Sequence, residues 1–353
     1  MKGKYGCVCF AVPKNLLRHL ADKSEGAHKQ MLLDQIDHSA QLRGARAATS
    51  AKGTARPERG TKPLHRQVFD AQGQTRLPGA LLRHEDGKPV HDNPAANQAY
   101  DNLGIALAFF SEVFGRDSAD GAGMRIDASV HYGFGFANAM WTGEQMVVGD
   151  GDGRHTHNIA GSLGIIGHEL SHALSQHLIK GGLGVVLAAD QPPRLEGEAG
   201  ALNESFSDIC ASMIKQWHAG QDVHQADWLL GEDILAEHAG HAVRSLKDPG
   251  NPKLTWPEDD QIKDYKRFKP SQEPHTASGV GNHAFYLAAT ELGGRSWESL
   301  GLVWLKGYQK LQARSTYVDA ARATADAAAE VHGKDSKPHQ AVRAAWKAVN
   351  VTA

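Results

Sequence analysis

Two histidines and a glutamate lie within an apolar, helix-like run near the middle of the sequence. The run IIGHELSHALSQH (165–177) places His168 and His172 four positions apart, with Glu169 beside the first. Residues four apart on a helix share a face, so both imidazoles can reach one zinc ion at about 2 Å. Glu169 then lies beside the metal, where its carboxylate can take a proton from a water that zinc has acidified. The spacing predicts hydrolytic zinc chemistry.

A catalytic zinc site needs a third protein ligand and one open position. The segment EAGALNESFSDICASM offers Glu204 on a second predicted helix, with Asp208 four residues later on the same face. Asp208 can accept the spare N–H of a ligating histidine. The same spacing also occurs on solvated helix faces, and a chain with 20 histidines can contain the first motif by chance. Spacing alone therefore leaves Glu204 a candidate.

Composition narrows the protein class. The chain has 353 residues, is 41% hydrophobic and carries a net charge of -2, as expected of a globular protein with two domains. We expect neither nucleic acid nor a membrane as partner, since the charge attracts neither and no apolar run approaches the roughly 18 residues of a membrane span. Pro13 interrupts the first apolar patch, so we expect a cytoplasmic precursor without signal peptide, or one exported by a leaderless route. The odd count of cysteines disfavours a disulfide framework.

Patterning divides the chain into regions. Residues 14–43 predict one or two short helices, and 43–63 is rich in small and basic residues, which indicates an exposed linker. Hairpin, helix and strand signals over 64–160 predict an α+β domain, whereas 161–353 is mainly helical. Helical periodicity begins at 159 and covers 159–180, 199–217, 276–292, 297–312, 316–331 and 338–349.

GHELSHAL followed by GALNESFSD resembles the thermolysin family of zinc metalloproteases. The resemblance implies an α+β, two-domain thermolysin-like fold: an N-terminal mixed β-rich domain and a C-terminal mainly α-helical domain, with the zinc cleft between them. It implies that one catalytic Zn²⁺ is bound by His168, His172 and Glu204. Asn203 and Asp208 would contact the metal ligands on the side that faces away from the zinc.

Other segments carry the family's substrate-binding and catalytic positions. NAMWTGEQMVVGDGDG looks like its edge strand, which binds extended peptides by strand addition. Asn138 and Ala139 would therefore pair with the substrate main chain, and Trp141 would line the cleft. VRSLKDPG is similar to the segment whose arginine, here Arg244, holds the substrate carbonyl and the zinc-ligand glutamate.

PHTASGVGNHAFYLAA resembles the segment with the family's second catalytic side chain. The match carries over His275 as hydrogen-bond donor to the tetrahedral oxyanion, while Glu169 serves as the base. The implied activity is a zinc endopeptidase that hydrolyses peptides and proteins and prefers a bulky hydrophobic residue after the cut.

The N-terminal residues are similar to the short propeptide of protealysin-like family members. We expect residues 1–50 to be a propeptide that inhibits the enzyme intramolecularly, joined by a cleavable linker at 51–63. A thiolate of Cys7 or Cys9 can take the open zinc position. The alternative is that both cysteines are small buried hydrophobes.

The chain departs from the family pattern near the cleft. An extra loop is expected between His172 and Glu204, and Leu195 stands where the family has an oxyanion-binding tyrosine. Pro270 replaces the aspartate that orients His275, with Glu273 or Asp264 as possible substitutes. These losses motivate a second hypothesis, a catalytically weak zinc-stabilised binding protein whose N-terminal segment blocks the cleft. A metallohydrolase for non-peptide substrates is disfavoured by the peptide-binding strand.

The family's calcium positions also differ. Gly164 and Lys215 replace two carboxylates, so we predict that the paired Ca²⁺ site is lost and that the Lys215 ammonium occupies its place, with Glu232 as partner. The GDGDG run at 149–153 is either a weak calcium loop or a plain turn.

Overall fold

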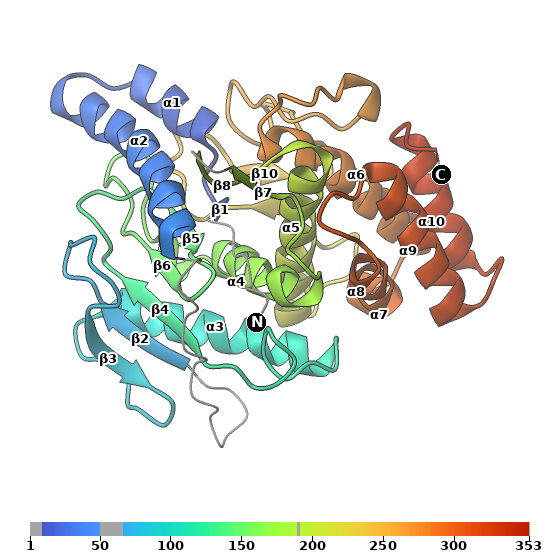
Figure 1. Cartoon of the computed structure of the whole chain (residues 1–353), viewed down its shortest axis with the longest axis horizontal. Coiled ribbons are helices and arrows are strands. Elements are labelled where there is room, and N and C mark those ends of the chain that lie inside the picture. Colours follow the sequence, from blue (N-terminus) through green and yellow to red (C-terminus); the bar gives the residue numbers. More distant parts are fainter. Residues whose placement is uncertain (1–8, 50–65, 189–190, 353) are drawn as a thin grey trace.

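The computed structural model describes residues 9–49, 66–188 and 191–352. Figure 1 shows a sheet with helix α3 (Pro94–Glu112) on one side of the molecule and a group of helices on the other. Helix α4 (Leu163–Leu178) lies between them. The predicted α+β class, with a β-rich half and a helical half, is confirmed.

The sheet has six strands in the order β1-β5-β6-β4-β2-β3. Strand β4 runs parallel to β2 and β6, and the other neighbouring pairs are antiparallel. The strands are β1 (Cys9–Phe10), β2 (Arg66–Asp70), β3 (Ala80–His84), β4 (Ile126–Val130), β5 (Ala139–Trp141) and β6 (Met146–Val148). Strand β1 comes from the N-terminal segment and covers β5, which would otherwise be the edge of the sheet.

The helical half contains most of the predicted helices within a few residues of their expected bounds. They are α5 (Gly197–Ala219), α6 (Pro274–Leu292), α7 (Ser296–Ser299), α8 (Gly301–Gln309), α9 (Tyr317–His332) and α10 (Lys337–Ala348). Short elements connect them: the 3-10 helices η2 (Ile159–Gly161) and η3 (Tyr265–Arg267), and the pair β9 (Leu229–Leu230) and β10 (Arg244–Ser245). The Ser162 hydroxyl accepts the N–H of Ile165 and caps α4, and Gly220 at φ 66° ends α5.

Helices α4 and α5 pack closely because small residues meet between them. A Cβ on Gly167 would lie 3.5 Å from the Cα of Ala211 and 3.2 Å from Cδ1 of Ile214. All residues of α4 from Gly164 to Ser175 are buried. The two helices that carry the predicted ligands are thus held in one core, which continues into the sheet half.

The N-terminal segment forms α1 (Lys14–Asp22) and α2 (Gly26–Thr49). Leu16, Leu17 and Leu20 of α1 are buried in the main core cluster. Because α2 continues to Thr49, the start of the expected linker at 43–63 is helical rather than extended; residues 50–65 lie outside the described residues.

The expected extra loop before Glu204 is a hairpin. Strands β7 (Val185–Ala188) and β8 (Gln191–Leu195) pair antiparallel, and α2 lies beside β8. Leu195, the residue aligned with the family tyrosine, is the last residue of β8.

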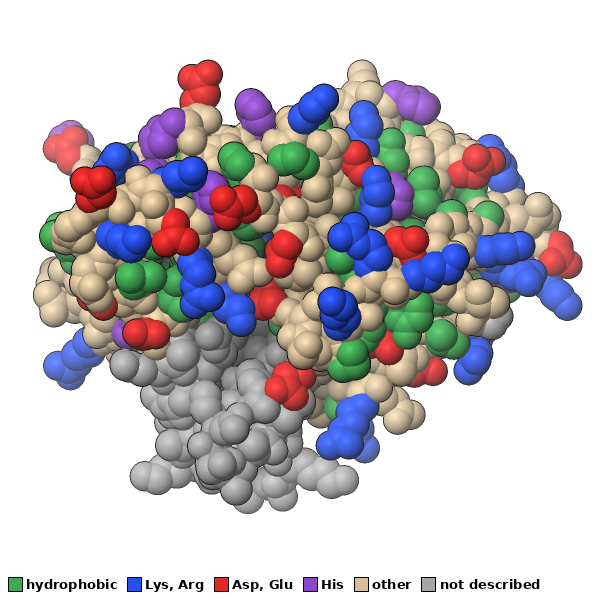
Figure 2. Space-filling model, turned by 90° about the horizontal axis from the view of Figure 1, so that it is seen from above, with side chains coloured by type: hydrophobic (Ala, Val, Ile, Leu, Met, Phe, Trp, Pro, Cys, Tyr) green, Lys and Arg blue, Asp and Glu red, His purple; other side chains and the backbone are tan. Residues whose placement is uncertain are grey.

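Both charge signs are interspersed over the face shown in Figure 2. Over the described ranges, no helix combines the length and apolar character needed to cross a bilayer.

Candidate active site

The structure brings His168, His172 and Glu204 together. The two histidine Nε2 atoms are 3.1 Å apart, and Oε2 of Glu204 lies 3.4 Å from Nε2 of His168 and 3.5 Å from Nε2 of His172. Ligand atoms about 2.0–2.1 Å from a tetrahedral ion are about 3.3 Å apart. All three side chains are buried, and this Glu204 oxygen makes no hydrogen bond among the described residues. The donor set fits one zinc ion.

The three ligand atoms form the His168–His172–Glu204 triangle. Neighbouring side chains orient both histidines so that their Nε2 atoms face its centre. Nδ1 of His168 lies 2.8 Å from Oδ1 of Asp208, and Nδ1 of His172 lies 3.2 Å from Oδ1 of Asn203. Donation from each Nδ1–H leaves the Nε2 lone pair free to bind a metal. Ser207, which was not predicted from the sequence, also contacts this histidine: its hydroxyl lies 3.1 Å from Nδ1 of His172.

Asp208 is the centre of a buried charge network. Arg244 donates from Nε at 2.9 Å and 3.0 Å to the two carboxylate oxygens, and Asn282 donates at 2.8 Å. Among the described residues the carboxylate that Arg244 holds is thus that of Asp208, and not that of Glu204 as expected. Burial raises the pKa of Asp208, but Arg244 and His168 more than offset this and bring it to about 2. Asn282 follows His275 by two helical turns and so shares its face of α6, a periodicity signal that the sequence analysis did not use.

Glu169 lies beside the triangle and is held by β5. Its Oε2 accepts the backbone N–H of Trp141 at 2.5 Å, whereas Oε1 makes no hydrogen bond among the described residues. Burial raises the pKa of Glu169 to about 8. The indole of Trp141 is buried, and its Nε1–H donates to Gln176. That Trp141 lines the cleft stays a prediction.

His275 lies beside Glu204. Its Nε2 is 3.1 Å from Oε2 of Glu204, and its Nδ1 is 2.7 Å from Oε1 of Glu273. Burial lowers the pKa of His275, but the two carboxylates raise it to about 10. Of the two substitutes considered for Pro270, Glu273 contacts His275 and also caps α6, whereas Asp264 caps η3.

The residues expected to bind a peptide main chain all contact the N-terminal segment. Ala11 donates its N–H to the carbonyl of Ala139 at 3.1 Å, and Val12 donates its N–H to Oδ1 of Asn138 at 2.8 Å. Asn138 returns a hydrogen bond from Nδ2 to the carbonyl of Val12 at 2.9 Å. Arg244 donates from Nη1 to the carbonyl of Ala11 at 2.7 Å.

The N-terminal cysteines are only partly described. Cys9 pairs with Trp141 across β1 and β5, and its side chain, like the whole of Cys7, lies outside the described residues. Zinc binding by either thiolate stays a prediction.

Comparison with known proteins identifies the class to which this fold and site belong. Residues 45–176 match the model of the thermolysin metallopeptidase catalytic domain, and residues 194–351 match that of the thermolysin metallopeptidase alpha-helical domain. The chain therefore belongs to the thermolysin family of metallopeptidases, and it is a zinc metalloendopeptidase.

Individual relatives are similar over most of the chain. Protease PrtS of Photorhabdus sp. (strain Az29) is 32% identical over 96% of this chain and 91% of its own length. An extracellular metalloprotease of Pectobacterium carotovorum subsp. carotovorum is 38% identical over 68% of this chain and 67% of its own. The solved structure of the precursor of protealysin, a metalloproteinase from Serratia proteamaculans, has a TM-score of 0.81 at 32% identity and covers 98% of this chain and 100% of that one.

Replacing Asp208 tests the network behind His168. In Asp208→Asn the Nδ1–H of His168 keeps an acceptor but loses the negative charge, so we expect zinc affinity to fall by about 10–100-fold. Competition with a zinc chelator measures the change, and circular dichroism checks the fold. Asp101→Asn, at a carboxylate that is 64% exposed, is the matched control. Equal affinities in the two variants would contradict a supporting role for Asp208.

Proposed function

We propose that the protein is a zymogen whose active site hydrolyses peptide bonds with Glu169 as general base. Two observations support this proposal: the buried His168–His172–Glu204 triangle, and the hydrogen bonds of the N-terminal segment to the strand where a peptide substrate is expected. The triangle supports zinc-dependent hydrolysis, and the hydrogen bonds of the N-terminal segment support its role as an inhibitor.

Bound zinc would act as a Lewis acid and would lower the pKa of a water bound to it to about 7. Glu169 takes a proton from the attacking water at its free Oε1 and later gives a proton to the leaving amine. The N–H of Trp141 holds the other carboxylate oxygen, so the base keeps one orientation through both transfers.

His275 and Arg244 are placed to act on the substrate carbonyl. Nε2 of His275 makes no hydrogen bond among the described residues, so its N–H can donate to the oxyanion. Arg244 already donates to a peptide carbonyl, that of Ala11. With Leu195 in place of the family tyrosine, stabilisation of the oxyanion rests more heavily on these two residues and the metal.

The inhibition follows from competition for the same hydrogen-bonding groups. Strand β1 occupies β5 by antiparallel pairing, and Ala11 and Val12 satisfy Ala139, Asn138 and Arg244. A substrate needs these groups for strand addition, so it cannot bind until the segment leaves. We propose that cleavage within 51–63 permits this release, and that the active form prefers a bulky hydrophobic residue after the cut.

Time-resolved mass spectrometry of the wild type and Glu169→Ala tests the base and the zymogen together. We expect both to hold zinc, but only the wild type to lose its N-terminal segment and then digest an unfolded protein, with large apolar residues following the cuts. Glu298→Ala, at an exposed carboxylate, should behave as the wild type. If Glu169→Ala digests the substrate at the wild-type rate, Glu169 is not the base. A wild type that stays inert after its segment is trimmed by another protease favours the binding-protein hypothesis.

Glu273 is proposed as a positioning residue for His275. In Glu273→Gln the helix cap can persist while the charge facing the ring is lost, so we expect kcat to fall about tenfold, equivalent to about 1.4 kcal/mol of transition-state stabilisation. KM and zinc content should change little. Steady-state kinetics on the trimmed enzyme, beside Glu298→Gln, measure this. A rise in KM at constant kcat would assign Glu273 to substrate binding instead.

Lys215 is proposed to replace a calcium ion. Its ammonium donates to the carbonyl of Leu229 at 2.8 Å, to Asp227 at 3.3 Å and to Glu232. Calcium would need these same oxygens. We therefore expect millimolar calcium to leave the Tm of the wild type unchanged, and Lys215→Gln to lower it because Glu232 loses its cation. Calorimetry with and without calcium measures the Tm of both proteins. A calcium-dependent rise in the wild-type Tm would refute the proposal that Lys215 replaces the ion.

A further inference from the structure

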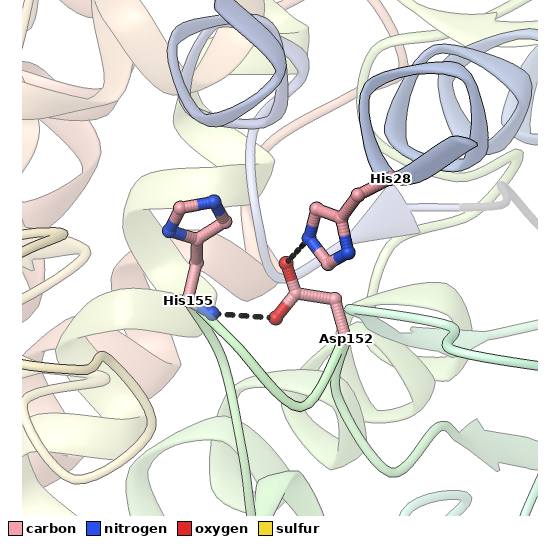
Figure 3. A group of neighbouring side chains, drawn as sticks. All are labelled: His28, Asp152 and His155. Atoms are coloured by element: carbon pink, nitrogen blue, oxygen red, sulfur yellow. Dashed lines mark hydrogen bonds and ion pairs between the residues drawn. The ribbon is translucent and has the colours of Figure 1, made fainter. Parts of the chain in front are cut away.

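A second group of metal-ligating side chains lies between the N-terminal segment and the sheet half. It consists of His28 in the first turn of α2, and Asp152 and His155 in the loop after β6 (Figure 3). One ligand atom from each residue lies within 4.8 Å of the others. Among the described residues, only this group and the active-site triangle have that arrangement.

Asp152 directs one carboxylate oxygen toward this group. Its Oδ1 accepts the backbone N–H groups of Arg154, His155 and Thr156 at 3.1, 2.7 and 2.8 Å. Its Oδ2 lies 3.1 Å from Nε2 of His28. The loop therefore fixes the carboxylate from one side and turns the other oxygen toward α2, as Figure 3 shows.

His155 is oriented in the same way. Its Nδ1 lies 3.0 Å from Nε2 of His238, and its Nε2 lies 2.9 Å from Oγ of Ser24, just after α1. The Ser24 hydroxyl itself donates to the carbonyl of Leu20 at 2.9 Å. A metal at Nε2 of His155 requires the tautomer in which Nδ1–H donates to His238, and it replaces the contact of Nε2 with Ser24.

We propose that His28, Asp152 and His155 form a second metal site, which binds Zn²⁺ through Nε2 of both histidines and Oδ2 of Asp152. Two imidazoles and a carboxylate are a typical zinc donor set. The Asp152 side chain is fully buried, whereas His28 is 23% exposed, so an ion can enter past His28 and keep a water as fourth ligand.

The site joins parts of the chain that separate on activation. His28 belongs to the segment that leaves, and Asp152 and His155 belong to the part that stays. If the zymogen proposal holds, on which this consequence rests, zinc at this site ties the segment to the catalytic part and slows its release. Metal binding itself requires only the intact chain.

Counting zinc in full-length chains tests the site. All chains carry Glu169→Ala, so that they stay intact, and are dialysed against micromolar zinc before elemental analysis. We expect two zinc ions per chain in this parent and one in its His28→Gln variant, whose amide can still hydrogen-bond Asp152 but replaces the imidazole. His91→Gln, at a side chain that is 92% exposed, should retain two.

Thermal unfolding gives a second readout. Added zinc should raise the Tm of the parent and of His91→Gln beyond that of the singly loaded protein, and should not raise that of His28→Gln. Equal zinc content and equal Tm shifts in the parent and His28→Gln would overturn the proposal and leave a hydrogen-bonded network only. Because the comparison counts metal in an inactive background, failure of the proposed peptidase mechanism would leave the difference between these chains intact.

Discussion

The buried ion pair between Asp208 and Arg244 is the interaction on which the rest of the site depends. Asp208 on α5 receives hydrogen bonds from α4, β10 and α6, so one carboxylate connects three helices and the strand of Arg244. A buried charge that loses its partner is costly, about 3–5 kcal/mol for a broken buried pair. The network is therefore stable only when its members are in place together.

The same ion pair couples the metal ligands to the peptide strand. Arg244 holds Asp208 through Nε and Nη2 and uses Nη1 for the carbonyl of Ala11. Its planar guanidinium fixes the directions of these bonds relative to one another. The main chain of the N-terminal segment, which lies along β5, is thus aligned against the residue that orients His168.

Helical periodicity made the central part of the site predictable. His168, His172, Glu204 and Asp208 are spaced by helical turns on two helices, and the core between α4 and α5 leaves little freedom in how these faces meet. Contacts set by irregular backbone were harder to predict. The replacement of Pro270 by Glu273 depends on the cap of α6, and the position of Leu195 depends on a hairpin that helical alignment did not suggest.

Contacts between distant segments could not be predicted from local sequence patterns. His28 and Asp152 are 124 positions apart, and each belongs to an ordinary local sequence, a helix start and a glycine-rich turn. Their meeting depends on how the N-terminal helices dock, which involves buried leucines and polar contacts such as that of Gln35 with the backbone of Ala137. No spacing rule within either segment contains that information.

The position of β1 also has a consequence for solubility. An uncovered edge strand presents unpaired N–H and C=O groups that can template aggregation with another extended chain, including a second molecule of the same protein. While β1 covers β5, this edge of the sheet is closed. The release proposed above would expose three residues, Ala139–Trp141, a length too short for extended intermolecular pairing. The brevity of β5 would thus limit self-association of a form in which this sheet edge is open.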